Sequence, residues 1–297
     1  MQAALGDALQ EGWSALIAAV DAGDGEAVAT LLEAGDDANQ AVVAPSEHPA
    51  LPDWLWIGAT PLLLAARKGD RPIVGILLGH EGIEVDKAKN DGGTSVHVAA
   101  QNGHLEVVRM LADKGANLDR TREDDGATPV LMAAREGHHE IVGLLVDMGA
   151  NLDLAKESGA SPVFKAAQNG HHEIVRLLAD KGANLDLARE TDAATPVFMA
   201  AQEGHHVIVS LLADKGANLD LADKYGSTPV FMAAQYGHHE VVCVLADKGA
   251  NLDLATKDGR TPVLMAAQQG HHEVVRVLAD KGANTVVVWR RFAAVEE

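Results

Sequence analysis

Aromatic residues are scarce in this chain, at 3% of its 297 residues. A core must therefore be built from Leu, Val, Ile, Ala and Met, which suits thin layers of closely packed helices better than a bulky globular centre. Long apolar runs are also lacking. The longest, from Trp54 to Ala66, is shorter than a membrane-spanning helix and contains the pair Thr60-Pro61. We therefore expect no membrane insertion.

Positive charge is in short supply, because 24 Lys and Arg residues stand against 43 Asp and Glu residues and give a formal net charge of −19. Nucleic acids require Lys- and Arg-rich faces that neutralise their phosphates. The longest basic run here is Arg290-Arg291. Neither nucleic acid nor an anionic membrane surface is therefore expected as a partner.

Cysteine is nearly absent, and Cys243 alone cannot form an internal disulfide. The segment Met1–Gly12 lacks the basic and apolar regions of a secretory signal. Both observations favour a cytoplasmic protein.

A recurring tripeptide divides the chain into modules. Thr-Pro-Val begins at Thr128, Thr195, Thr228 and Thr261. Related strings begin at Ser161, Thr60 and Thr94, and a degenerate copy begins at Ser14. From Thr60 onward, consecutive starts are 33 or 34 residues apart. The sequence therefore contains eight copies of one unit, and a search for such periods precedes any other fold argument.

Each copy predicts two helices joined by a turn, as the copy at Thr228 illustrates. The Thr228 hydroxyl can accept a hydrogen bond from the first helical turn, and Pro229 suits the first helical position. Gly237 is placed to end this helix in a left-handed conformation. A second apolar stripe follows and ends at Gly249.

Paired alanines recur in the first helix of the copies, as in Ala133-Ala134 and Ala233-Ala234. Their small side chains allow short distances between helices, so that neighbouring copies can stack tightly. One copy has too little area to bury its own apolar stripe, and its neighbours complete the core.

The strings Gly-x-Thr-Pro, Ala-Ala-x-x-Gly-His and Leu-x-x-x-Gly-Ala-Asn resemble the ankyrin repeat, whose period is about 33 residues. The resemblance covers nearly the whole chain. It implies an all-α solenoid of tandem helix-turn-helix repeats with β-hairpin fingers, wound into a curved superhelix with a concave groove.

The ends of the chain differ from its middle. We expect an N-terminal capping repeat at 1–39, an elongated connection with several Pro and Trp residues at 40–59, seven repeats at 60–284, and a C-terminal cap or tail at 285–297. The tail includes Val286-Val287-Val288-Trp289, for which a dimerisation or partner strand is the alternative. A monomer is expected.

Two departures from the repeat signature are informative. The histidine of the repeat signature is present only at His97. In five later copies an apolar residue takes its position and should add to the buried core: Leu131, Phe164, Phe198, Phe231 and Leu264. Ala193 stands where other copies have Gly. If this position is left-handed, Ala costs about 1–2 kcal/mol and makes the finger a weak joint.

Five adjacent histidine pairs invite a metal-binding interpretation: His138-His139, His171-His172, His205-His206, His238-His239 and His271-His272. Adjacent helical residues diverge by about 100°, and stacked copies should lie about 8–10 Å apart, so neither arrangement favours a shared ion. We expect no metal site. The first His of each pair should form a hydrogen bond to the neighbouring repeat, and the second should be half-buried. A His-rich array that responds to pH or metal remains an alternative function.

No catalytic constellation is apparent. Cys243 shares its repeat position with residues as different as Gly143 and Arg176, which indicates a solvent-facing site rather than a nucleophile. Phosphate-cradling loops and nucleophile elbows are absent from the sequence. We therefore expect no enzyme activity and no cofactor, with a regulatory or targeting segment of a larger enzyme as the alternative.

The predicted function is a protein–protein interaction scaffold, because in a stack of similar copies the varying positions carry the information. They are the pair after Ala-Ala and the finger tip, which the resemblance places along the groove. In the N-terminal copies these positions include Arg67-Lys68, Gln101-Asn102 and Arg122-Glu123-Asp124. The candidate partner-binding residues are Arg135, Glu136, Gln168, Asn169, Gln202, Glu203, Lys224, Tyr225, Gln235, Tyr236, Lys257, Gln268 and Gln269. Tyr225 and Tyr236 are the strongest, since Tyr is enriched at the energetic centres of interfaces.

Overall fold

The structure is a computed structural model that describes residues 14–42, 58–154 and 159–286. The predicted tail after residue 286 and most of the predicted connection at 40–59 lie outside the described residues. The described helices pair up in chain order, one pair for each of the eight sequence copies. They fall into two compact units, Met1–Asn151 and Leu152–Glu297.

The helices of the first unit are α2 Ala15–Ala22, α3 Gly25–Glu33, α4 Pro61–Lys68, α5 Arg71–Gly79, α6 Ser95–Gln101, α7 Leu105–Asp113, α8 Pro129–Glu136 and α9 His139–Asp147. Those of the second unit are α10 Pro162–Gln168, α11 His172–Asp180, α12 Pro196–Gln202, α13 His206–Asp214, α14 Pro229–Tyr236, α15 His239–Asp247, α16 Pro262–Gln268 and α17 His272–Asp280.

The helix boundaries arise from the capping residues that the sequence predicts. At the start of α14 the Thr228 hydroxyl accepts a hydrogen bond from the Phe231 N–H at 3.3 Å, and Pro229 occupies the first turn. Gly237 ends this helix with φ at 82°, a left-handed conformation that glycine adopts without strain. The prediction of an all-α solenoid of helix pairs is confirmed.

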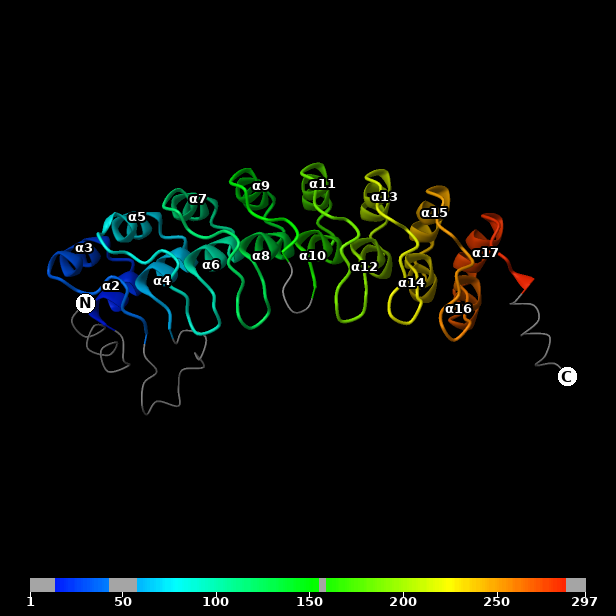
Figure 1. Cartoon of the computed structure of the whole chain (residues 1–297), viewed down its shortest axis with the longest axis horizontal. Helices are drawn as coiled ribbons and strands as arrows, with labels where there is room; N and C mark the ends of the chain where they lie inside the picture. Colours follow the sequence, from blue (N-terminus) through cyan, green and yellow to red (C-terminus); the bar gives the residue numbers. More distant parts are fainter. Residues whose placement is uncertain (1–13, 43–57, 155–158, 287–297) are drawn as a thin grey trace, which may run out of the picture. The chain divides into compact units, whose positions relative to one another are not determined.

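Within each unit, helices of the same rank stack against one another. In the second unit α10, α12, α14 and α16 contact each other in sequence, as do α11, α13, α15 and α17. In Figure 1 the even-numbered helices of a unit form one row and the odd-numbered helices another, and the fingers extend on the side of the even-numbered row. The fingers are therefore placed beside the ends of the inner, even-numbered helices.

The fingers themselves are turns, and the described part of the chain contains no strand. Within the described residues, the fingers that begin at Lys89, Arg122, Arg189, Asp223 and Thr256 close on themselves through a backbone hydrogen bond, such as that from Arg122 N–H to the Ala127 carbonyl at 2.9 Å. A second bond reaches the preceding finger, as from Lys257 N–H to the Tyr225 carbonyl at 2.9 Å. The β-hairpin character that the resemblance predicts is thus limited to these turn and inter-finger bonds.

Aspartates tie successive repeats together near the base of the fingers. The Asp186 carboxylate accepts a hydrogen bond from the Asn218 N–H at 2.8 Å, and Asp220 accepts one from Asn251 at the same distance. Equivalent bonds join Asp86 to Asn117, Asp119 to Asn151, Asp153 to Asn184, and Asp253 to Asn284. Each tie reaches only the next repeat, so coupling along the chain is local.

The apolar replacements of the signature His are buried, as predicted. In the second unit a cluster combines three phenylalanines with three methionines and two alanines: Phe164, Phe198, Phe231, Met199, Met232, Met265, Ala160 and Ala194. Leu131 packs with Met132 and Ala127 in the first unit. Most of the paired alanines between the helices are fully buried, which accounts for the close stacking of the inner row.

Ala193 is left-handed, with φ at 64°, and no other non-glycine residue in the described ranges has a positive φ. The equivalent glycines, such as Gly226 with φ at 84°, adopt the same conformation without a Cβ. The expected strain at this finger is therefore present in the structure.

Replacing Ala193 with Gly is expected to raise the free energy of unfolding by about 0.5–1 kcal/mol. Relief of left-handed strain outweighs the greater freedom that glycine gives the unfolded chain. The midpoint of urea unfolding, followed by circular dichroism, measures the gain. The matched control is Gly226→Ala, whose new Cβ would lie 3.0 Å from the Lys257 nitrogen and should destabilise the protein. An unchanged or lower midpoint for Ala193→Gly would contradict the strain argument.

Candidate functional site

In four of the five pairs the first histidine contacts the end of the inner helix in the preceding repeat. His138 Nε2 donates to the Gln101 carbonyl at 2.9 Å, and His271 Nε2 donates to the Gln235 carbonyl at 3.0 Å. The same contact joins His104 to Arg67, His205 to Gln168 and His238 to Gln202. The predicted hydrogen bond between repeats is confirmed for His138, His205, His238 and His271. It uses the backbone carbonyl of the variable position after Ala-Ala rather than its side chain.

The prediction for the second histidine is wrong in four of the five pairs. His139, His172, His206 and His272 are exposed, and only His239 is half-buried. The buried stripe of these helices begins at the third residue, so the first helical residue lies at its solvent-exposed end. Cys243 also differs from expectation, because it is half-buried rather than solvent-facing. Among the described residues no group of three or more His, Cys, Asp or Glu side chains is arranged to hold a metal ion.

All thirteen candidate partner-binding residues are exposed or half-buried. Arg135 and Glu136 lie at the end of α8 in the first unit, where their side chains pair at 2.9 Å. The other eleven belong to the second unit, at the ends of its inner helices or on its fingers. Gln202 donates to Glu203 at 3.0 Å, and Gln168 accepts from Lys165 at 3.0 Å.

The two tyrosines contact different neighbours. Tyr225, 62% exposed, lies on a finger beneath the Lys224 ammonium, 5.2 Å from its ring centre. Tyr236, 50% exposed, stacks on His238 at 6.3 Å between ring centroids. Both therefore present aromatic surface to solvent, one from a finger and one from a helix end.

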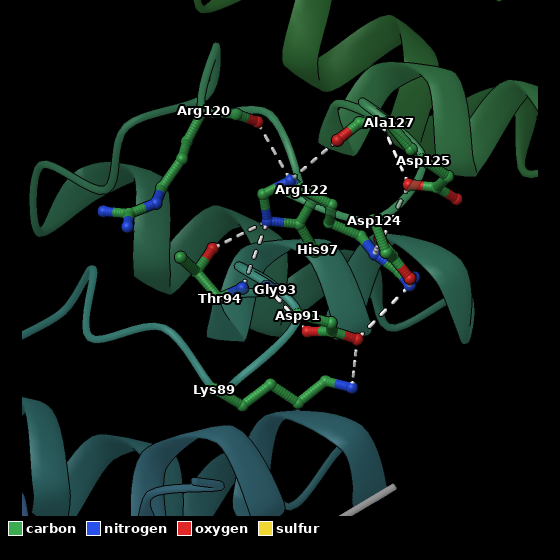
Figure 2. A network of polar contacts seen from close by, with 10 residues as sticks. All are labelled: Lys89, Asp91, Gly93, Thr94, His97, Arg120, Arg122, Asp124, Asp125 and Ala127. Atoms are coloured by element: carbon green, nitrogen blue, oxygen red, sulfur yellow. Dashed lines mark hydrogen bonds and ion pairs between the residues drawn. The ribbon is translucent and has the colours of Figure 1, made fainter. Parts of the chain in front are cut away.

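A hollow of about 490 Å³ lies in the first unit, between its inner helices and two of its fingers. Its apolar floor is formed by Leu63 of α4, Val98 of α6 and Met132 of α8. The remaining lining residues are Arg67, Gln101 and Asn102 at helix ends, His97 of α6, and Lys89, Asp91, Gly93, Arg122 and Asp124 of the fingers. Figure 2 shows the polar residues on the finger side of this hollow.

A chain of ion pairs joins the two fingers (Figure 2). Asp91 pairs with Lys89 of its own finger and with Arg122 of the next finger, the latter at 3.2 Å. Arg122 Nε donates to Asp124 at 3.0 Å and lies 3.5 Å from Asp125. The Lys89 and Arg122 side chains are only 14% and 17% exposed. The fingers therefore hold two cations in fixed positions at the wall of the hollow.

The pKa values in this network follow from burial and pairing. Burial opposes ionisation of Asp91, but the Lys89 hydrogen bond, the Gly93 N–H and the charges of Lys89 and Arg122 outweigh it and hold its pKa below the ordinary value. Burial likewise opposes the charge on Arg122, and its three aspartate partners raise its pKa nonetheless. Asp91 and Arg122 are therefore both ionised at neutral pH.

His97 anchors the second of these fingers from inside the core. Its Nδ1 accepts from the Thr94 N–H at 3.2 Å, which places the ring proton on Nε2. Nε2 lies 2.9 Å from the Arg120 carbonyl and 3.2 Å from the Ala127 carbonyl, at the two ends of the finger. Burial lowers the pKa of His97 to about 4, although the two carbonyls favour the protonated ring.

The sequence analysis had singled out some of the residues that line this hollow. Arg67, Gln101, Asn102, Arg122 and Asp124 occupy positions that the repeat pattern marks as variable. Lys89 and Asp91 were missed.

One sequence pattern could have identified Lys89 and Asp91. It is a basic residue at the start of a finger, followed two or three residues later by Asp. Arg122 with Asp124 and Arg189 with Asp192 share this pattern. Only contacts between fingers, which sequence does not give, reveal that Asp91 also joins Arg122.

The fold defines a solenoid of helix pairs, a class whose stacked modules present extended faces. A family model described as "Ankyrin repeats (3 copies)" matches residues 46–122, 117–189 and 184–256, and one described as "Ankyrin repeats (many copies)" matches 236–279. The chain belongs to the ankyrin repeat family. Ankyrin repeats are protein–protein interaction modules, and the matches indicate no catalytic family.

Curated relatives resemble only a part of the chain. Cortactin-binding protein 2 of Ornithorhynchus anatinus is 35% identical over 65 residues, which is 21% of this chain and 4% of the relative. Inversin of Danio rerio is 35% identical over 63 residues, or 21% of this chain and 6% of that protein. This chain therefore spans a small fraction of the length of these relatives.

Among solved structures, the human ASB11 ankyrin repeat domain is similar, with a TM-score of 0.66 and 27% identity over 76% of this chain and 99% of that domain. None of the described helices is long and apolar enough to span a bilayer.

Proposed function

We propose that this chain is a non-catalytic scaffold that binds a protein partner through the concave groove and the finger tips. One observation carries the proposal. The thirteen candidate residues, at varying positions of inner helix ends and fingers, are exposed or half-buried, whereas the recurring Thr-Pro caps and alanine pairs of the inner helices are mostly buried in the stack. Such a surface offers side chains for contact without disturbing the core beneath them.

The exposed tyrosines support a binding centre in the second unit. Large apolar side chains are seldom left exposed without a role when they gather at one face, and Tyr combines contact area with a hydroxyl group. Tyr225 and Tyr236 belong to a finger and to the inner helix that follows it, the two kinds of position that the proposal names.

Affinity purification with the full chain, followed by mass spectrometry, tests this proposal. The variant Tyr225→Ala with Tyr236→Ala is expected to lower the recovery of the partner at least tenfold, because truncated aromatic anchors dominate interface energies. The matched control is Val207→Ala, which trims another apolar side chain, 51% exposed, on the outer helix α13. Equal recovery by all three proteins would refute the placement of the binding centre.

The proposal extends to the state of the protein. We infer a cytoplasmic monomer without nucleic-acid partners, in which 1–39 caps the stack, 40–59 connects, 60–284 holds seven repeats and 285–297 forms a cap or tail. The formal charge of −19 supports the monomer through mutual repulsion of copies. Light scattering checks the 31.1 kDa mass, and imaging of a fluorescent fusion checks the location.

A further inference from the structure

We propose that the second unit binds an uncharged, proline-rich segment of the protein partner, held in the polyproline II conformation along the ends of its inner helices. This inference rests on the proposed function and names the chemistry of the segment that is bound there. It depends on four glutamines at the last or next-to-last position of the inner helices, called the amide row below: Gln168, Gln202, Gln235 and Gln268.

The amide row presents one side-chain amide in each repeat of the second unit. The Gln202 carbonyl accepts from His238 at 2.9 Å, and the Gln235 carbonyl accepts from His271 at 3.0 Å, so successive helix ends are held in the same way. The glutamine side chains are half-buried or exposed. Figure 1 shows α10, α12, α14 and α16 in one row, with the fingers on the same side. The amides therefore recur with the period of the stack.

The period of the stack matches one peptide conformation. Packed helices lie about 8–10 Å apart. A polyproline II helix rises about 3.1 Å per residue with three residues per turn, so the same face recurs every ~9.3 Å. A β-strand presents the same face every ~6.8 Å, because its side chains alternate. Only the polyproline II segment therefore offers equivalent groups to successive amides of the row.

The main chain of such a segment supplies the hydrogen-bonding groups that the amide row needs. Polyproline II has no internal hydrogen bonds, whereas an α-helix satisfies its own main chain and would offer the row only side chains. Gln168 uses its oxygen to accept from Lys165, which leaves its NH₂ group to donate. Gln202 donates to Glu203, which leaves its oxygen to accept.

The charges around the amide row balance. The four inner helices and their C-cap residues contain two charged side chains of opposite sign, Lys165 and Glu203. A charged segment would lose hydration here without a net Coulomb attraction, which favours an uncharged one. The fingers at 189–194, 223–227 and 256–260 carry four positive and four negative residues: Arg189, Lys224, Lys257 and Arg260 against Glu190, Asp192, Asp223 and Asp258.

The two exposed tyrosines of this unit suit proline rings. Proline-rich segments dock on aromatic side chains, and proline fixes its own backbone in advance, so little ordering is required on binding. The Tyr225 ring lies against the Lys224 ammonium and the Tyr236 ring against His238, so each has a neighbour that restricts its orientation. Tyr236 directly follows Gln235 of the amide row, and a segment on the row would therefore pass this ring.

Selection from a phage-displayed library of random twelve-residue peptides on the full chain provides the probe. We expect enriched peptides that carry Pro at positions i, i+3 and i+6 and few charged residues. Binding of a synthetic copy of an enriched peptide is then measured by fluorescence anisotropy. Insertion of one Ala between the first two of these prolines should weaken binding at least tenfold, because it breaks the match with the repeats.

Variants of the chain locate the peptide on the second unit. Tyr236→Ala is expected to weaken binding at least tenfold, and Gln235→Ala severalfold. The matched control is Gln101→Ala in α6 of the first unit, where the Gln101 carbonyl accepts from His138 at 2.9 Å. This control should bind within twofold of the parent chain. Both glutamine substitutions keep the main-chain bond and introduce the strongest helix former, so their comparison does not depend on a loss of folding.

Four outcomes would overturn the inference. They are enrichment of charged or proline-free peptides, no enrichment at all, equal binding of the peptide with and without the inserted Ala, and equal binding by Gln235→Ala and Gln101→Ala. Each of them leaves the proposed function standing. Failure of the proposed function would appear instead in the purification experiment with the whole partner.

Discussion

Replacing Phe198 with Ala is expected to lower the free energy of unfolding by about 3–5 kcal/mol. The ring is 4% exposed and belongs to the cluster that contains Phe164 and Phe231. Its loss removes apolar contacts on both sides and leaves a cavity that rigid neighbouring helices fill only in part. Urea unfolding followed by circular dichroism gives the measurement.

The control for this prediction is Tyr225→Ala, which removes an aromatic ring that is 62% exposed. Substitutions at exposed positions usually change stability by no more than about 0.5 kcal/mol. If both variants unfold at the same urea concentration as the parent chain, the phenylalanine cluster does not contribute to the stability of the second unit.

Acidification from pH 6.5 to pH 4 is expected to cost about 3 kcal/mol through His97 alone. Burial lowers its pKa from the model-compound value of 6.5 to about 4 in the folded chain. In this window the unfolded state binds the proton and the folded state does not, so stability falls as the pH falls. The contribution is fully present above pH 6.5. The nearest charges, Arg122 and Asp91, oppose each other in their effect on the ring.

The variant His97→Leu isolates this contribution, because Leu131 and Leu264 occupy the equivalent position in other repeats. Chemical unfolding at a series of pH values should show a smaller loss of stability between pH 6.5 and pH 4 than in the parent chain. The carboxylates and the other histidines are common to both proteins and cancel in the comparison. Identical pH profiles would show that His97 titrates normally in the folded state.

The fold was open to prediction because its determinants are local and repeated. Thr228, Pro229 and Gly237 specify the start and end of one helix by themselves, and the same residue types recur at each period. The strain at Ala193 was predictable for the same reason, since one residue differs from its equivalents. Such features require only the position of a residue within its own repeat.

The candidate site was only partly predictable, because its geometry depends on neighbours. The exposure of His139 depends on where the buried stripe of α9 begins relative to the start of the helix. Comparison of the sequence copies alone did not reveal that position. The role of Asp91 depends on a contact with Arg122 in the next finger. The two residues lie at different points of successive repeats, so no alignment of the copies brings them together.

The aspartate ties near the base of the fingers make the length of the second unit adjustable in whole modules. Excision of residues 195–227 would join Ala194 directly to Thr228 and bring Asn251 to the carboxylate of Asp186, which now accepts from Asn218. Duplication of the same segment would extend the series by one step. A binding face built in this way can be lengthened or shortened without redesign of any single joint.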